Sequence, residues 1–104
     1  MDSALREQLD WIASQEGAMI ELTERWSAIN SGSYHIEGLR TMRFALEEAF
    51  AVLHGTTEVL PLAAIMQINA QGEKLEIPMA EALRITKRPN APIQLLLVGL
   101  VLIW

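Results

Sequence analysis

Residues 92–104 read PIQLLLVGLVLIW, an almost continuously apolar run that carries no charge. Its length and its Leu, Val and Ile content predict a strand that is buried on both faces, as in the interior of an α/β sheet. Such a strand needs cover from helices and from neighbouring strands. The rest of the chain is therefore expected to supply helices and strands around it.

The composition bounds the class of protein. A chain of 104 residues forms one domain at most, which we divide into a helical part over 1–55 and a strand part over 56–104. The net charge of -5 argues against nucleic acid as a partner, because phosphate binding draws on a basic surface. The chain has no cysteine, so disulfides and thiolate metal sites are excluded.

No segment is expected to direct export or to enter a membrane. The N-terminus lacks the basic segment and following apolar run of a signal peptide. The apolar run at the other end is shorter than the ~20 residues that a spanning helix needs. We expect a soluble, cytoplasmic protein without a membrane partner.

The first half of the chain predicts three helices. The first covers 4–13, with Asp2 or Ser3 as its cap, and the second begins near Ser14, with Gly17 weakening the join. The third covers 36–53 and closes at His54 and Gly55, with the glycine just past the helix end. The apolar stripes that indicate them are Leu5, Leu9 and Ile12, then Met19, Leu22, Trp26 and Ile29, then Leu39, Met42, Leu46, Ala49, Phe50 and Leu53.

After residue 55 the pattern changes to that of strands. Residues 56–60 are rich in β-branched side chains, and Pro61 ends this strand or confines it to an edge. Residues 65–68 and 74–77 flank the turn sequence NAQG and predict a hairpin. Residues 82–87 alternate apolar and polar side chains, as a half-buried strand does, and 89–92 turn the chain into the final run.

Three motifs follow one another in a recognisable order. They are INSGS at 29–33 with Glu37 and Gly38 shortly after, ALRI at 82–85 leading into KRPNAP at 87–92, and LLLVG at 95–99. Together they resemble the N-terminal part of the zinc-dependent glutamate carboxypeptidases, in the superfamily of aminoacylase, acetylornithine deacetylase and succinyl-diaminopimelate desuccinylase. The resemblance covers about residues 5–99.

This resemblance implies a fold and a parent activity. The fold is α/β, with three N-terminal helices packed on a small mixed sheet, as an incomplete zinc-peptidase catalytic domain. The parent activity is zinc-assisted hydrolysis of an amide bond that releases a C-terminal amino acid such as glutamate.

The sequence departs from the family where the family's chemistry begins. There the apolar strand leads into His-x-Asp-Thr-Val, whose histidine binds zinc and whose aspartate orients that histidine. Here the sequence LVLIW follows Gly99, so neither catalytic residues nor metal ligands can be carried over. We expect a truncated, inactive part of such an enzyme, without a cofactor of its own, produced by a reading-frame change after Gly99.

Two other functions are open at this point. The chain could be a free-standing protein–protein interaction module, or a subunit that complements a separately encoded remainder of the enzyme. In each case we expect a homo-oligomer, because an uncovered apolar strand invites a second copy. The residues expected to form that contact are Leu95, Leu97, Leu100, Leu102 and Trp104.

Residues that could bind a metal or react are few. His35 and His54 lie at opposite ends of the third predicted helix, which places them more than ~20 Å apart and excludes a shared ion. We interpret His35 as a solvated or capping residue and His54 as a cation at a helix end. Ser31 and Ser33 have no adjacent base and are interpreted as turn and cap residues.

The remaining polar and aromatic residues favour structural roles. Glu47 and Glu48 are neighbours on a helix and do not face each other, so we interpret them as part of a solvated face. Trp11 and Trp26 are interpreted as core or interface anchors. The basic residues Arg84, Lys87 and Arg88 are expected at the exposed end of a strand, with a small anion site as the alternative.

Overall fold

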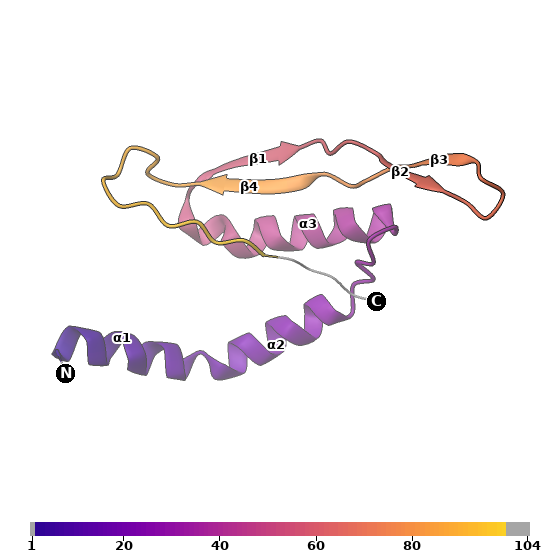
Figure 1. The fold of residues 1–104 in the computed structure, drawn as a ribbon. Helices are drawn as coiled ribbons and strands as arrows, with labels where there is room; N and C mark the ends of the chain where they lie inside the picture. Colours follow the sequence, from indigo (N-terminus) through magenta and orange to yellow (C-terminus); the bar gives the residue numbers. More distant parts are fainter. Residues whose placement is uncertain (1, 100–104) are drawn as a thin grey trace.

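The computed structural model describes residues 2–99 and shows a mixed α/β chain (Figure 1). Three helices come first: α1 (Ser3–Ser14), α2 (Glu16–Ser27) and α3 (Ile36–Phe50), which continues into the 3₁₀ turn η1 (Ala51–Leu53). The strands β1 (Thr56–Leu60), β2 (Ile65–Ile68), β3 (Lys74–Ile77) and β4 (Ala82–Thr86) follow. The predicted order of helices and then strands is confirmed.

Helices α1 and α2 form an arm that lies apart from the strands, beneath the layer of α3 and the β1–β4 pair (Figure 1). Asp2 caps α1 by accepting a hydrogen bond from the Ala4 N–H, as predicted. The chain breaks at Gln15, between the two helices, and not at Gly17. Ser14 was predicted to cap α2, but it is the last residue of α1, and its hydroxyl donates to the Trp11 carbonyl. Neither helix buries a residue.

Helix α3 forms from the apolar stripe that the sequence predicted, and it lies along the sheet of β1 and β4 (Figure 1). Met42, in the middle of the stripe, is 2% exposed. The predicted end of this helix is confirmed, because η1 ends at Leu53 and His54 and Gly55 follow it. The left-handed residue there is His54, with a φ of 54°, and not the glycine. Gly55 serves a different purpose, because a Cβ there would lie 2.7 Å from the Thr86 carbonyl oxygen of β4.

The four strands form two separate antiparallel sheets of two strands each. β1 pairs with β4 from Thr56 opposite Thr86 to Leu60 opposite Ala82. β2 pairs with β3 as the predicted hairpin. In chain order, the β2–β3 hairpin lies between the two paired strands β1 and β4. Pro61 directly follows β1, and Pro78 directly follows β3. Because proline has no N–H to donate, the two prolines interrupt the ladder between the sheets.

The predicted packing of three helices on one mixed sheet is therefore wrong in two respects. Every strand pair in residues 2–99 is antiparallel, and α1 and α2 bury none of their residues. The chain is correspondingly extended, with a radius of gyration of 18.3 Å. A compact domain of this length has a radius of about 13 Å. Among residues 2–99, the buried ones lie in α3, in the loop before it and in the segment before β4: Ser31, Gly38, Met42 and Ala80.

Residues 100–104 of the buried strand predicted over 92–104 lie outside the described residues, and the prediction is wrong for residues 92–99. These residues form no strand, and Ile93 and Val98 are 82% and 79% exposed. A strand needs partners for its backbone N–H and C=O groups, and no described strand lies alongside to supply them. The start of the run is instead tied to the preceding turn, because the Gln94 amide donates to the carbonyls of Arg88, Pro89 and Ala91.

Candidate functional site

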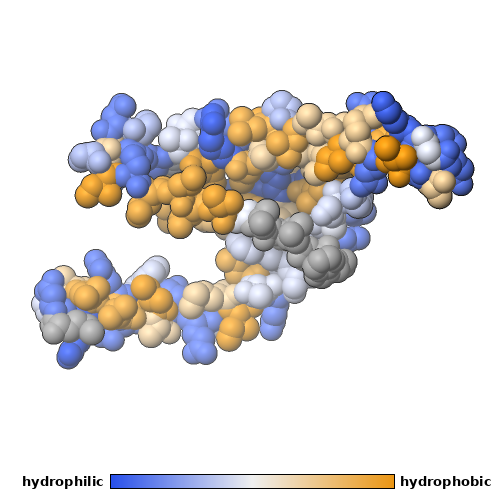
Figure 2. Space-filling view, viewed as in Figure 1, coloured by the Kyte–Doolittle hydropathy of each residue, from blue (hydrophilic) through white to orange (hydrophobic). Residues whose placement is uncertain are grey.

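The most exposed apolar segment of the described chain is the run from residue 93 to residue 98, which we call the apolar tail. Leu95 and Leu97, two of the residues predicted to mediate self-association, are 89% and 90% exposed. Figure 2 shows hydrophobic side chains gathered on the layer that faces the α1–α2 arm. The other three predicted contact residues, Leu100, Leu102 and Trp104, lie outside the described residues.

A cavity of about 230 Å³ lies between α3 and the segment that leads into β4. One wall comes from the α3 stripe and the other from residues around Ala80 and Leu83. The loop before α3 closes one end of it with Ser31 and Ser33. Ser31 is fully buried there, although the sequence indicated only a turn residue. The cavity is lined mostly by aliphatic side chains and methionines, with Arg43 and Glu81 as its charged residues.

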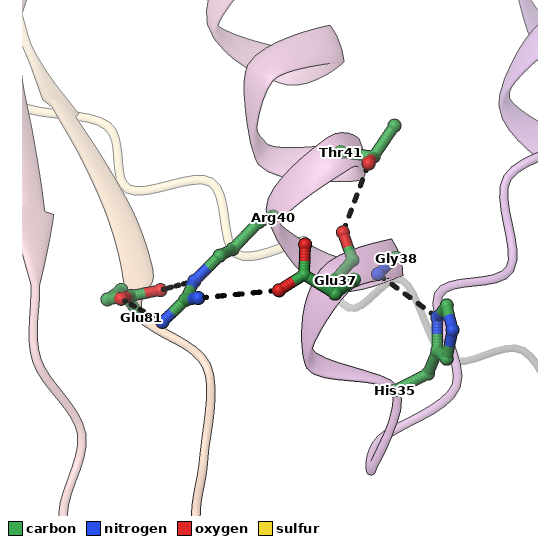
Figure 3. A network of polar contacts seen from close by, with 6 residues as sticks. All are labelled: His35, Glu37, Gly38, Arg40, Thr41 and Glu81. Atoms are coloured by element: carbon green, nitrogen blue, oxygen red, sulfur yellow. Dashed lines mark hydrogen bonds and ion pairs between the residues drawn. The ribbon is translucent and has the colours of Figure 1, made fainter.

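A polar network fixes the start of α3 (Figure 3). His35 is the N-cap, and its Nδ1 accepts a hydrogen bond from the Gly38 N–H at 3.0 Å, which confirms the predicted capping role. The same Nδ1 lies 3.0 Å from the Asn30 carbonyl oxygen. Thr41 donates from its hydroxyl to the Glu37 carbonyl within the first turns of the helix. The bonds from Gly38 and Thr41 thus fix the cap and the first turns of α3.

Arg40 joins this helix to the segment before β4. Its Nη2 and Nε donate to the two carboxylate oxygens of Glu81, at 3.2 and 3.4 Å, and its Nη1 lies 3.8 Å from Glu37 (Figure 3). A hydrogen bond from its own backbone N–H, followed by the one from Arg40, lowers the pKa of Glu81 below its ordinary value. The hydrogen bond to Glu81 in turn raises the pKa of Arg40. Both side chains are therefore charged at neutral pH.

The other charged candidates are paired or exposed. Arg84 donates to Glu58 across the β1–β4 pair at 2.8 Å, and this bond raises the pKa of Arg84. Glu47 accepts from Arg43 at 2.9 Å one helical turn away, while Glu48 is exposed. The solvated-face interpretation thus holds for Glu48, whereas Glu47 is half-buried in an ion pair.

The described residues do not fit the zinc site that the family resemblance implies. His35 and His54 lie on either side of α3 and η1, as the sequence predicted. Within residues 2–99, His, Asp and Glu side chains nowhere gather in a group of three that could hold a metal ion. Trp11 is 64% exposed and is therefore not a core residue. No helix of the described chain combines the length and apolar character needed to cross a membrane.

Two features of this region have no signal in the sequence. Arg40 and Glu81 are 41 residues apart, and their contact depends on how α3 lies against the strands. The cavity arises in the same way, from segments distant in the sequence. The burial of Ser31, within the INSGS loop before α3, likewise depends on the packing of that loop and was not predicted.

Comparisons with known proteins give no relative of this chain: no protein-family model matches it, and no curated protein or solved structure matches it significantly. The carboxypeptidase resemblance therefore depends on the three sequence motifs alone.

Proposed function

We propose that this chain is an N-terminal scaffold part of a zinc-dependent amidohydrolase that resembles the glutamate carboxypeptidases, and that it does not hydrolyse amide bonds by itself. The motif residues support this by their positions. INSGS forms the junction of α2 and α3, and ALRI lies in β4. LLLVG covers residues 95–98 of the apolar tail and Gly99 directly after it. In the resembled family, the corresponding segments precede the first zinc ligand.

The exposure of the apolar tail is the observation that carries the proposal. Five large apolar side chains between residues 93 and 98 are 79–90% exposed. Fully burying one such side chain contributes ~1.5–3 kcal/mol. Leaving all five in water therefore forgoes an amount comparable with the stability of a whole small domain, about 5–15 kcal/mol. Polypeptide other than residues 2–99 is needed as cover, and the rest of a catalytic domain would provide it.

In such an enzyme, bound zinc activates a water molecule and polarises the scissile carbonyl. This chain has Leu100 and Leu102 where the family's zinc-binding histidine and its aspartate would stand. Its own contribution is positional: α3 and the β1–β4 pair hold the turn from which the apolar tail leaves. The ligands and the general base would have to come from other polypeptide.

Zinc titration and an activity assay test the inactive state of the chain. We expect no stoichiometric zinc binding by calorimetry, and no release of glutamate from N-acyl-glutamate with zinc or cobalt present. One zinc site per chain with sub-micromolar affinity would contradict the proposal. So would glutamate release that a chelator abolishes.

The nucleotide sequence of the gene can test whether a reading-frame change after Gly99 produced this chain. Translation of the DNA from the Gly99 codon in the other two frames is expected to yield a His-x-Asp-Thr-Val continuation. Stop codons or unrelated sequence in both frames would favour a free-standing interaction module instead.

We propose in addition that a second copy of the chain can cover the apolar tail. Both outer edges of the β1–β4 sheet lack a strand partner among residues 2–99, and unpaired edges accept further strands. Leu95 and Leu97 would share one face of such an added strand.

Light scattering after size exclusion tests this association. We expect a dimer or larger assembly, and a shift toward monomer when Leu95 and Leu97 are replaced by lysine. The matched control is Ile68→Lys, which changes an apolar side chain that is 72% exposed in the β2–β3 hairpin. A monodisperse monomer at micromolar concentration, or an equal shift in the control, would contradict the contact. Deletion of residues 100–104 separately tests the predicted share of Leu100, Leu102 and Trp104.

A further inference from the structure

Two apolar surfaces of the described chain are exposed and face each other across open space. The first is the apolar tail. The second, which we call the α1 stripe, consists of Leu5, Leu9 and Ile12, which share one face of the helix and are 44–51% exposed. Figure 2 shows hydrophobic side chains on the arm and on the layer above it, with a gap between the two. Neither surface is packed against the rest of residues 2–99.

The segments that carry these two surfaces have opposite charges. The arm, from Asp2 to Ser27, has six acidic and two basic side chains, which gives a net charge of -4. Residues 87–99, which include the apolar tail, have the two cations Lys87 and Arg88 and no acidic residue. The Gln94 amide bonds the Arg88 carbonyl, so the cations lie beside the start of the tail. Arm and tail are therefore complementary in charge as well as apolar.

The two surfaces also match in length. Helix α1 has 12 residues and, at ~1.5 Å per residue, is about 18 Å long. The six residues of the apolar tail span at most ~20 Å when fully extended. One α1 helix is therefore long enough to cover the tail from end to end.

The junction between α2 and α3 favours a second copy as the source of that helix. To reach the tail of its own chain, the arm would have to swing about the loop between α2 and α3. Ser31 in this loop is fully buried, and the Asn30 carbonyl lies close to Gly38 of α3, so such a swing would disrupt packed residues. A second copy can present its arm with this junction intact. A two-fold symmetric pair forms the contact twice and leaves neither arm nor tail uncovered.

We infer that the α1–α2 arm is a docking element for a second copy of this chain, and that two copies exchange their arms so that each α1 stripe packs on the apolar tail of the other. This inference rests on the proposed association of two copies, and it names the element that meets the tail. Burial of the two apolar surfaces would provide most of the affinity. The opposite charges would favour pairing of arm with tail over pairing of arm with arm.

Introduced cysteines can test the contact directly, because the chain has none of its own. The full-length double variant Leu9→Cys/Leu96→Cys is oxidised under mild conditions and its mass is measured. Exchange of arms is expected to give a disulfide-linked dimer. The matched control is Leu9→Cys/Ile68→Cys, which places the second thiol on the exposed β2–β3 hairpin and is expected to remain largely unlinked.

A mixture of single-cysteine variants tells which elements meet. Leu9→Cys is mixed with ¹⁵N-labelled Leu96→Cys, so that each linked pair has its own mass. We expect links between labelled and unlabelled chains to exceed those between two like chains. A majority of links between two Leu96→Cys chains would show that tails pair with tails, and would overturn the docking of the arm.

Sedimentation equilibrium measures the contribution of the α1 stripe. The variant Leu9→Gln/Ile12→Gln is expected to raise the dissociation constant by at least about tenfold, since large apolar side chains leave both copies of the contact. The control Met66→Gln/Ile68→Gln makes the same kind of change at two exposed positions of β2 and is expected to leave the constant unchanged. Circular dichroism at 222 nm reports whether α1 remains helical in the variant.

Charge reversal tests the complementarity without altering the stripe. Lys87→Glu is expected to weaken association by roughly 2- to 5-fold, the value of an exposed ion pair, and the difference from wild type should shrink at high salt. Lys74→Glu is the control, because it changes the net charge equally at an exposed position of β3. An equal effect of both substitutions would contradict the proposed position of Lys87 beside the arm of the second copy.

The outcomes separate this inference from the association on which it rests. A monodisperse wild-type monomer at micromolar concentration would overturn both. A dimer whose dissociation constant is the same in Leu9→Gln/Ile12→Gln would overturn the docking of the arm alone. A disulfide within one chain of Leu9→Cys/Leu96→Cys would show that each arm covers its own tail. If the glutamine variant loses its helix, the Lys87→Glu comparison and the mixed cysteine variants decide instead.

Discussion

Gly38 is the position where a single methyl group should damage this fold most. A Cβ built there would clash with the Asn30 carbonyl oxygen and with the His35 Nδ1. Gly38→Ala therefore requires the loop and the helix to move apart at that point. The nearest atom belongs to the backbone, so a change of side-chain rotamer cannot relieve the clash.

Two costs follow from that displacement. Forcing extra volume into a packed site costs about 1–3 kcal/mol, and loss of the His35 cap adds about 1 kcal/mol, so Gly38→Ala should destabilise the chain by ~2–4 kcal/mol. For a domain of this size, that corresponds to a fall on the order of 10–20 °C in the melting temperature. Thermal unfolding followed by circular dichroism at 222 nm measures this difference.

Gly17→Ala is the matched control, because it makes the same substitution in another helix. No atom lies within 4 Å of a Cβ at Gly17, so the alanine meets open space. Alanine is favoured over glycine in a helix by up to ~1 kcal/mol, so the control should be neutral or slightly stabilised. An unchanged melting temperature for Gly38→Ala, or similar losses for both variants, would refute the close packing of the α2–α3 junction.

Two further predictions concern the polar contacts. Because the pKa of Glu81 is lowered in the folded chain, its bond with Arg40 stabilises the fold above the ordinary carboxyl pKa of 4.5, and this contribution is lost as the pH falls through the lowered value. Urea unfolding should therefore show a larger deficit of Glu81→Gln against wild type at pH 7 than at pH 3, and an equal deficit at both would contradict it. In the hairpin, the Asn69 side-chain oxygen accepts from the N–H groups of Gln71 and Glu73, both at 2.9 Å. Asn69→Ala should cost about 1 kcal/mol and speed amide hydrogen exchange in β2 and β3, whereas unchanged protection would show that the turn does not depend on it.

The parts of the fold that the sequence predicted are those with local causes. The α3 stripe places one apolar residue per turn on one face, and this pattern indicates a helix from the segment's own sequence alone. The β2–β3 hairpin has its turn residues between two short apolar strands. His35 lies directly before a helix, where a side-chain acceptor meets free backbone N–H groups.

The parts that the sequence did not predict depend on distant segments. The ion pair of Arg40 with Glu81 and the cavity beside Ser31 exist only once α3 lies against β4. The four strands divide into two sheets at Pro61 and Pro78. Both prolines are visible in the sequence, but they separate the sheets only because β2 and β3 lie between β1 and β4 in the chain. The role of Gly55 also depends on a distant segment. The sequence predicted it as the residue that ends the helix, but the structure needs a glycine there because the backbone passes close to Thr86 in β4.

The apolar tail illustrates why composition alone does not make a strand. Leu, Val and Ile favour strands because their side chains pack on a pleated, half-buried surface, and the preference weakens when that surface is missing. Backbone pairing is equally conditional, since each N–H and C=O needs a partner on a neighbouring strand. Within residues 2–99, Leu95 and Leu97 have neither kind of partner, and the chain there is exposed and irregular. The same sequence is therefore expected to become a strand when another polypeptide, such as a second copy of the chain, provides an edge and a covering layer.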